Sequence, residues 1–164
     1  MSGKWDKSGV PRKGWTCEGV EDLSAPNAVC EMCETQEIRY VHSMTHPSYP
    51  ETLRVGCVCA EHMEGDYKAP RERERQLRNR AARRARWLGR RWSRARREGC
   101  WYLNTDGLHL AIWRSTDGTW TGQIKNPVSG FSVNSRRRYT SEDQMKLAAF
   151  DAMLALKERW GLGK

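Results

Sequence analysis

Apolar residues recur at helical spacing along the arginine-rich stretch from residue 71 to residue 98. They are three or four positions apart and would share one narrow face of a helix: Leu77, Ala81, Ala85, Leu88, Trp92 and Ala95. The other faces carry mainly arginine, with Trp87 at the edge of the stripe. The pattern predicts one amphipathic helix over 71–98. Pro70 suits its first turn, and Gly89 is a weak point where it can bend.

After Gly99 the pattern changes to short segments rich in β-branched and aromatic residues. The segments are WYLNTDG, LHLAIWRS, TWTGQIKN and GFSVNSRRRY, and turn signals such as Asp106-Gly107 separate them. A helix is predicted next, opened by a capping box of Ser141 and Gln144. Its expected packing face is Met145, Ala148, Ala149, Ala152, Leu156 and Trp160. Residues 100–160 are therefore predicted as antiparallel strands followed by one helix, a βββα unit.

The first part of the chain divides into two segments. Residues 1–25 show no periodicity and are predicted to be irregular, with Trp5 and Trp15 docking on the body of the protein. Within 26–67, EIRYVHSM and ETLRVGC predict two strands, and AEHMEGDY predicts the start of a helix. The expected fold class is thus α+β: a small metal-binding module, a long arginine-rich helix, and a three-stranded antiparallel sheet packed on a C-terminal helix.

Cysteine spacing in 26–67 indicates a metal site. CEMC can present two thiolates to one ion from a tight turn, and CVCAEH follows it. Tetrahedral zinc needs four such ligands. Five residues are candidates for the four places: Cys30, Cys33, Cys57, Cys59 and His62. We expect a structural Zn²⁺ ion there, because CEMC lacks the βαβ surroundings of a redox dithiol.

The choice among these five ligands stays open. Cys30 and Cys33 form the firm pair. Either Cys57 and Cys59 complete the site with His62 exposed, or Cys59 and His62 complete it with Cys57 spare. The remaining cysteines, Cys17 and Cys100, lie outside the spacing and are predicted to be free thiols.

The order of knuckle, hairpin and helix start resembles a treble-clef zinc site. VHSMTHP places His42 and His46 between the two ligand pairs. With these histidines the segment also resembles nucleases of the His-Asn-His type, in which a hairpin histidine activates water beside a metal. That resemblance makes His42 and His46 candidate catalytic residues. The histidines are four apart and the loop has no Asn, so packing within the hairpin, or zinc ligation by one of them, is the favoured alternative.

The net charge of +9 is concentrated in 71–98, which holds 13 Arg and 3 Glu, while the rest of the chain holds 16 Lys and Arg against 17 Asp and Glu. Arginine offers a planar fork for phosphate. The candidate nucleic-acid-binding residues are Arg78, Arg80, Arg83, Arg84, Arg86, Arg90, Arg91, Arg94 and Arg97. An acidic protein partner and a solvated spacer are the alternatives. A mean hydropathy of −0.85 and the lack of a long apolar run predict a cytoplasmic protein without a membrane partner.

GTWTGQI, SRRRYTSED and LAAFDAML give residues 100–160 a resemblance to the three-stranded DNA-binding domain of plant ethylene-response factors and phage integrase arms. It implies a nucleic-acid face made by Trp113, Arg114, Thr119, Trp120, Gln123, Lys125, Arg136, Arg137 and Arg138. Double-stranded-RNA-binding domains are also similar, if the arginine-rich helix is counted as their first helix. The alternative for the tryptophans is packing against the helix.

The whole chain resembles small bacterial and phage proteins that join a Cys-x2-Cys module to an arginine-rich helix. We expect a zinc-stabilised protein that binds DNA or RNA, in a regulatory or accessory role, more readily than an enzyme. One alternative is a protein that inhibits or bridges a nucleic-acid-processing complex, such as CRISPR, polymerase or ribosomal machinery, through the same arginines. Another is a metal-dependent nuclease of the His-Asn-His kind.

Overall fold

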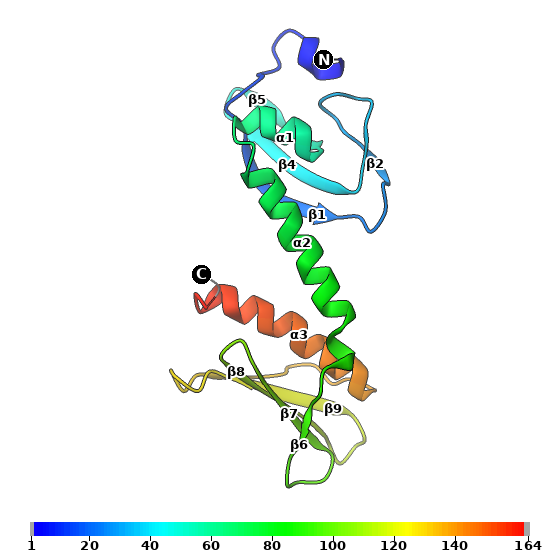
Figure 1. Ribbon diagram of the computed structural model, residues 1–164, viewed down its shortest axis with the longest axis vertical. Coiled ribbons are helices and arrows are strands. Elements are labelled where there is room, and N and C mark those ends of the chain that lie inside the picture. The colour runs from blue at the N-terminus through cyan, green and yellow to red at the C-terminus, as the bar shows by residue number, and fades with distance from the viewer. Residues whose placement is uncertain (1, 163–164) are drawn as a thin grey trace. The chain divides into compact units, whose positions relative to one another are not determined.

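A computed structural model describes residues 2–162 of the chain, which form three α-helices and three antiparallel sheets. The α+β class is therefore confirmed. Contacts divide the chain into two compact units, Met1–Ala81 (unit 1) and Ala82–Lys164 (unit 2). Helix α2, drawn in green in Figure 1, spans Ala69–Ala85 and passes from unit 1 into unit 2.

Unit 1 is built on a three-stranded sheet in the order β1-β4-β5. Its strands are β1 (Thr16–Asp22), β4 (Tyr40–His46) and β5 (Tyr49–Val55). A 3-10 turn, η1 (Gly3–Asp6), precedes this sheet in the chain, and helix α1 (Cys57–Glu64) follows it. Between β1 and β4 the chain forms a separate two-stranded ribbon of β2 (Ala28–Val29) and β3 (Glu37–Ile38). The predicted hairpin and the predicted helix start are both present.

The N-terminal segment is more ordered than its sequence indicated. Trp5 and Trp15 are buried, as predicted, with 5% and 4% of their surface exposed. The Trp15 indole N–H donates to the carbonyl of Pro11 at 2.7 Å. Strand β1 was not predicted, because TCEGVED is mostly polar and shows no clear alternation of apolar and polar residues. Backbone pairing with β4, which needs no side-chain pattern, makes it a strand.

Unit 2 contains a five-stranded antiparallel sheet in the order β10-β9-β8-β7-β6. The strands are β6 (Ser93–Arg94), β7 (Cys100–Thr105), β8 (Leu108–Arg114), β9 (Trp120–Lys125) and β10 (Ser132–Asn134). The Asp106-Gly107 turn has φ angles of 55° and 74°, as a two-residue hairpin loop requires. Helix α3 (Glu142–Arg159) starts where the hydroxyl of Ser141 accepts the N–H of Gln144 at 3.2 Å, so the predicted cap is confirmed.

The prediction of one helix over 71–98 is wrong beyond Ala85. The chain leaves α2, makes a single 3-10 turn, η2 (Trp87–Gly89), and then adds β6 to the sheet edge. The cause is the burial of two indoles: Trp87 is fully buried and Trp92 is 7% exposed, both in the core of unit 2. Leu88, assigned to the apolar stripe, is instead 39% exposed. Two buried tryptophans outweigh continuation of a helix whose arginines repel one another.

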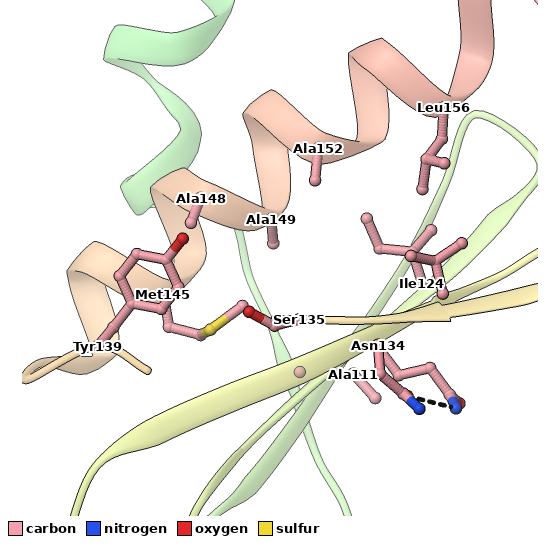
Figure 2. A pocket seen from close by; sticks show the side chains of 13 residues that line it. Ala111, Ile124, Asn134, Ser135, Tyr139, Met145, Ala148, Ala149, Ala152 and Leu156 are labelled. Carbon is pink, nitrogen blue, oxygen red and sulfur yellow. Dashed lines mark hydrogen bonds between the residues drawn. The ribbon is translucent and has the colours of Figure 1, made fainter. Parts of the chain in front are cut away.

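The predicted packing face of α3 is confirmed in part, because Met145, Ala149 and Leu156 are buried in the core of unit 2. Phe150 and Met153 are fully buried, although neither was assigned to that face. Five residues of the predicted face line an apolar hollow of about 80 Å³ between α3 and the strands β9 and β10: Met145, Ala148, Ala149, Ala152 and Leu156. Figure 2 shows the alanines of α3 opposite Ile124 across this hollow.

Candidate metal centre and arginine surface

Three thiols meet at one point in unit 1. Cys30 and Cys33 bracket the turn after β2, and Cys59 lies in the first turn of α1. Their sulfur atoms lie within 4.8 Å of one another, and Cys30 and Cys59 are buried. Sulfur atoms bound to one tetrahedral zinc at about 2.3 Å are roughly 3.8 Å apart. The three residues therefore need only a small contraction to bind one metal ion.

The turn that carries Cys30 is fixed by its own backbone. The N–H of Glu34 donates to the Cys30 carbonyl at 2.8 Å, and the N–H of Cys30 donates to the Gln36 carbonyl at 2.8 Å. Glu34 has a positive φ of 58°, which closes the loop tightly enough to return the chain to β3. The knuckle predicted from CEMC is thus a real local structure.

Hydrogen bonds also prepare the Cys30 sulfur for a metal. They lower the pKa of Cys30 to about 5: the largest effect comes from the Cys59 thiol, and the backbone N–H groups of Cys33, Gly56 and Met32 add to it against the effect of burial. The N–H of Gly56 lies 3.5 Å from the sulfur. Metals bind the thiolate form. The same hydrogen bond between the two thiols raises the pKa of Cys59, so that thiol must lose its proton when a metal binds. Because thiolates are soft ligands, the three cysteines together fit a thiophilic cation.

The first residues of the chain cover this centre. In η1, the N–H of Lys4 donates to the Met32 carbonyl at 2.8 Å. A Cβ at Gly3 would lie 2.6 Å from the carbonyl carbon of Cys33, so only glycine fits so close to the knuckle. Trp5 belongs to the same buried cluster as Cys30. The N-terminal segment therefore screens the thiols from water.

Neither of the other two predicted ligands, Cys57 and His62, is among the three clustered thiols. Cys57 is part of a different cluster, with His42 and Glu74. The ring of His62 stands edge-on to Trp5 and Tyr67, with centroids 6.3 and 5.6 Å away. The sequence left two ligand sets open. The set that includes Cys57 does not match this arrangement, because Cys57 lies in the other cluster.

The two candidate catalytic histidines have separate surroundings. The Nδ1 atom of His46 accepts the N–H of Ser48 at 3.0 Å, and its ring lies 5.3 Å from that of Trp15. His46 therefore packs within the hairpin, the alternative role that the sequence allowed. His42 is fully buried and its Nε2 atom lies 3.3 Å from a carboxylate oxygen of Glu74.

The remaining cysteines lie outside the three-thiol centre. The Cys17 thiol of β1 lies 3.3 Å from the carbonyl oxygen of Gly19, and Cys100 starts β7 in unit 2.

Comparisons of the chain with protein-family models, with curated proteins and with solved structures gave no match. Across residues 2–162, no helix has the length and hydrophobicity to cross a bilayer.

Several arginines of α2 are engaged in contacts within their own unit. In unit 1, Arg71 pairs with Glu61, Arg73 with Glu64 and Arg75 with Glu72, while Arg78 lies over the ring of Tyr40. In unit 2, Arg83 binds both carboxylate oxygens of Asp106 at 2.7 and 2.9 Å, and Arg84 binds those of Asp151 at 3.0 Å. Of the predicted nucleic-acid contacts, Arg78, Arg83 and Arg84 therefore have structural partners.

The exposed arginines are concentrated beyond the end of α2. Arg80, Arg86, Arg90, Arg91, Arg94 and Arg97 from the predicted set are exposed, as is Arg96, which was missed although it belongs to the same run. In the part of the chain that the structure describes, none of these seven makes an ion pair. Unit 2 holds 17 Lys and Arg against 7 Asp and Glu, whereas unit 1 holds 12 against 13. The positive charge therefore belongs to unit 2.

The sheet of unit 2 separates the remaining predicted contacts onto two faces. Alternate residues such as Leu110 and Ile124 are buried in the core with α3. Trp113, Gln123 and Lys125 alternate with these core residues and so lie on the opposite face. Tyr102 and His109, with ring centroids 5.6 Å apart, share that face and were missed, although CWYLNT and LHLAIWR alternate clearly enough to have placed them.

The other predicted contacts have local roles. Trp120 packs on the core, and its backbone pairs with Tyr139. Thr119 donates its hydroxyl to Asp117 at 2.6 Å in the β8–β9 turn. The Arg114 side chain donates to the Gly118 carbonyl at 3.4 Å. Arg138 donates to the Ser115 hydroxyl, and all three of Arg136, Arg137 and Arg138 are exposed.

Proposed function

We propose that the protein binds nucleic acid through unit 2 and that a structural Zn²⁺ ion stabilises unit 1. The observation that carries the proposal is the group of six exposed arginines between residues 86 and 97, called here the arginine segment: Arg86, Arg90, Arg91, Arg94, Arg96 and Arg97. Within residues 2–162 they have no carboxylate partners. A polyanion is the natural partner of such a surface.

The arginine segment is held in place by its tryptophans. Trp87 and Trp92 are buried in the core and their rings meet edge to face with centroids 6.1 Å apart. The guanidinium of Arg90 lies 5.7 Å from the Trp87 ring centroid, and that of Arg94 lies 5.6 Å from the Trp101 centroid. Preorganised arginines lose less side-chain entropy on binding a phosphate. A folded segment of this kind supports a defined binding surface.

The sheet face opposite α3 supports nucleic acid over an acidic protein as the partner. It carries Tyr102, His109 and Trp113 beside the polar Gln123, and each of these four side chains is half-buried. Aromatic side chains on a sheet stack on bases, and each stacked base contributes about 1–3 kcal/mol. An acidic protein surface would not need this combination of aromatic rings and arginines.

Zinc is the metal that best suits the three-thiol centre. Cys30, Cys33 and Cys59 supply soft thiolate ligands, and structural zinc sites are tetrahedral. His62 follows Cys59 by three residues on α1 and is the candidate fourth ligand. In this proposal the knuckle, the β4–β5 hairpin and α1 form a treble-clef-like module, and the ion links the knuckle to α1.

The test is the salt dependence of binding to fluorescently labelled DNA and RNA, single- and double-stranded, measured by anisotropy. If the six arginines of the segment each contact a phosphate, affinity should fall by about 10³ between 50 and 200 mM salt. Absence of salt-sensitive binding to every one of these probes would overturn the proposal.

A pair of charge-matched variants locates the surface. Arg90, Arg91 and Arg97 changed together to Gln remove three charges from the arginine segment and should lower the slope of log affinity against log salt by about three. The control changes Arg39, Arg54 and Arg75 to Gln in unit 1, where each makes an ion pair and more than 40% of each side chain is exposed. Equal losses in both variants would mean that total charge, and not this surface, governs binding.

A further inference from the structure

A second cluster of metal-ligand side chains lies in unit 1, apart from the three-thiol centre. His42 comes from β4, Cys57 is the first residue of α1, and Glu74 lies on α2. One ligand atom from each lies within 4.8 Å of the others. The closest pair that the structure gives is His42 Nε2 and Glu74 Oε1, at 3.3 Å. Three segments distant in sequence thus present nitrogen, sulfur and oxygen donors to one point.

The burial of His42 and Glu74 also supports a metal site here. Its side chain is 0% exposed, and its Nδ1 atom has no hydrogen-bond partner among the described residues. The Glu74 side chain is only 15% exposed. Burying polar groups that lack full hydrogen bonding costs free energy. A cation bound by the Nε2 atom of His42 and by the Glu74 carboxylate would offset the cost of burying these two groups, although it would not reach Nδ1.

Helix geometry explains how one short motif supplies two sites. Cys57 and Cys59 are two residues apart at the start of α1, so their side chains leave the helix about 200° apart. Cys59 turns towards Cys30 and Cys33, and Cys57 turns towards His42 and Glu74. Gly56, directly after β5, is the N-cap of α1, and this position of the helix start sets the direction of both sulfur atoms.

We propose that His42, Cys57 and Glu74 bind a second Zn²⁺ ion with one coordination position left for water. A surface hollow of about 190 Å³ reaches Cys57 and Glu74 and is also lined by Arg39 and Tyr40. This hollow gives solvent a path to the ion. Mixed nitrogen, sulfur and oxygen ligands suit zinc, and three protein ligands with one open position distinguish such a site from a closed structural one.

Metal content of the full-length chain tests the proposal. After reconstitution with Zn²⁺ and removal of free ion, native mass spectrometry should show two ions per chain. Cys57→Ser and Glu74→Gln should each retain one ion at concentrations that saturate both sites of the natural protein. Cys100→Ser in unit 2 is the matched control and should retain two.

Cobalt substitution assigns the ions to their sites. The three-thiol centre should give the stronger sulfur-to-cobalt charge-transfer absorption, and Cys57→Ser should remove only the weaker component. Glu74→Gln keeps the size of the side chain, so hydrogen exchange of unit 1 should stay close to that of the natural protein. A stoichiometry of one ion that Cys57→Ser leaves unchanged, or two ions retained by Glu74→Gln, would overturn the proposal.

Discussion

Replacing Trp87 by alanine should destabilise unit 2 by about 3–5 kcal/mol, the usual effect of deleting a buried tryptophan. The side chain is fully buried. Its ring centroid lies 4.9 Å from that of Phe150, and its indole N–H donates to the Lys146 carbonyl at 2.7 Å. The change therefore removes packing and one buried hydrogen bond together.

Trp87→Phe separates these two contributions. Phenylalanine keeps an aromatic ring against Phe150 but lacks the N–H that reaches the Lys146 carbonyl. A buried hydrogen bond contributes about 0.5–1.5 kcal/mol net. We therefore expect Trp87→Phe to destabilise unit 2 by about 1–2 kcal/mol, less than half the effect of alanine.

Hydrogen exchange of the full-length protein, followed by mass spectrometry, measures the effect in each unit separately. A loss of about 4 kcal/mol corresponds to nearly three decades of amide protection. That loss should appear in β7, β8 and α3, which form the core with Trp87, while unit 1 should be unaffected. Nucleic-acid affinity should fall as well, because the arginine segment loses its anchor.

Leu88→Ala is the control from the same turn. Leu88 is 39% exposed, so its truncation should change stability by no more than about 0.5 kcal/mol. A cost below about 1 kcal/mol for Trp87→Ala, or faster exchange only within residues 86–97, would contradict this expectation. Either result would mean that the arginine segment is an appended tail and not part of the core.

Two further predictions concern unit 2. The guanidinium of Arg83, and next to it the ammonium of Lys157, hold the pKa of Asp106 well below its ordinary 3.8. Because the folded-state pKa is the lower one, this stabilisation is complete above about pH 5 and is lost as the pH falls. Asp106→Asn should therefore lower the melting temperature at neutral pH, and the difference between the variant and the natural protein should become smaller in acid. Equal differences at both pH values would contradict this. A Cβ at Gly122 would lie 2.6 Å from the Ala111 carbonyl oxygen, so Gly122→Ala should lower the free energy of unfolding, measured by chemical denaturation, by about 1–3 kcal/mol. Gly89→Ala is the control and should leave it unchanged, because no atom lies within 4 Å of the added Cβ. Unchanged stability of Gly122→Ala would show that strands β8 and β9 can separate to accept the methyl group.

Local signals in the sequence predicted local structure correctly. Asp106-Gly107 closes a hairpin, and Ser141 caps α3 through Gln144, because each depends on neighbouring residues alone. The knuckle at Cys30 and Cys33 is local in the same sense. Such features need no knowledge of the rest of the chain.

The end of α2 depends on distant residues. The spacing of Leu, Ala and Trp is compatible with a helix through residue 98, and nothing within that stretch opposes it strongly. The decisive partner of Trp87 is Phe150, which lies in α3 and brings the indole into the core of unit 2. The sheet has five strands where three were predicted, and one of the two additional strands, β6, follows from the same event because it lies directly beyond η2.

The grouping of the candidate metal ligands also could not be predicted from the sequence. Cys57 and Cys59 are equivalent candidates in the sequence, and only the position at which α1 begins sends them to different clusters. Glu74 is one of only three glutamates in residues 71–98, and nothing in the sequence pattern marks it as a ligand. Its place beside His42 depends on the approach of α2 to β4, which no local pattern reveals.

The two-residue strand β6 forms one edge of the unit 2 sheet. An unpaired strand edge is a template on which a second copy of a chain can add its own strand. Here the edge is very short and carries Arg94, with Arg91, Arg96 and Arg97 beside it, so an approaching copy meets a row of like charges. The arginines proposed to bind phosphate should thus also hinder aggregation, because they repel a second copy at this edge. Neutralising them should therefore make the protein prone to self-assembly as well as weak in binding.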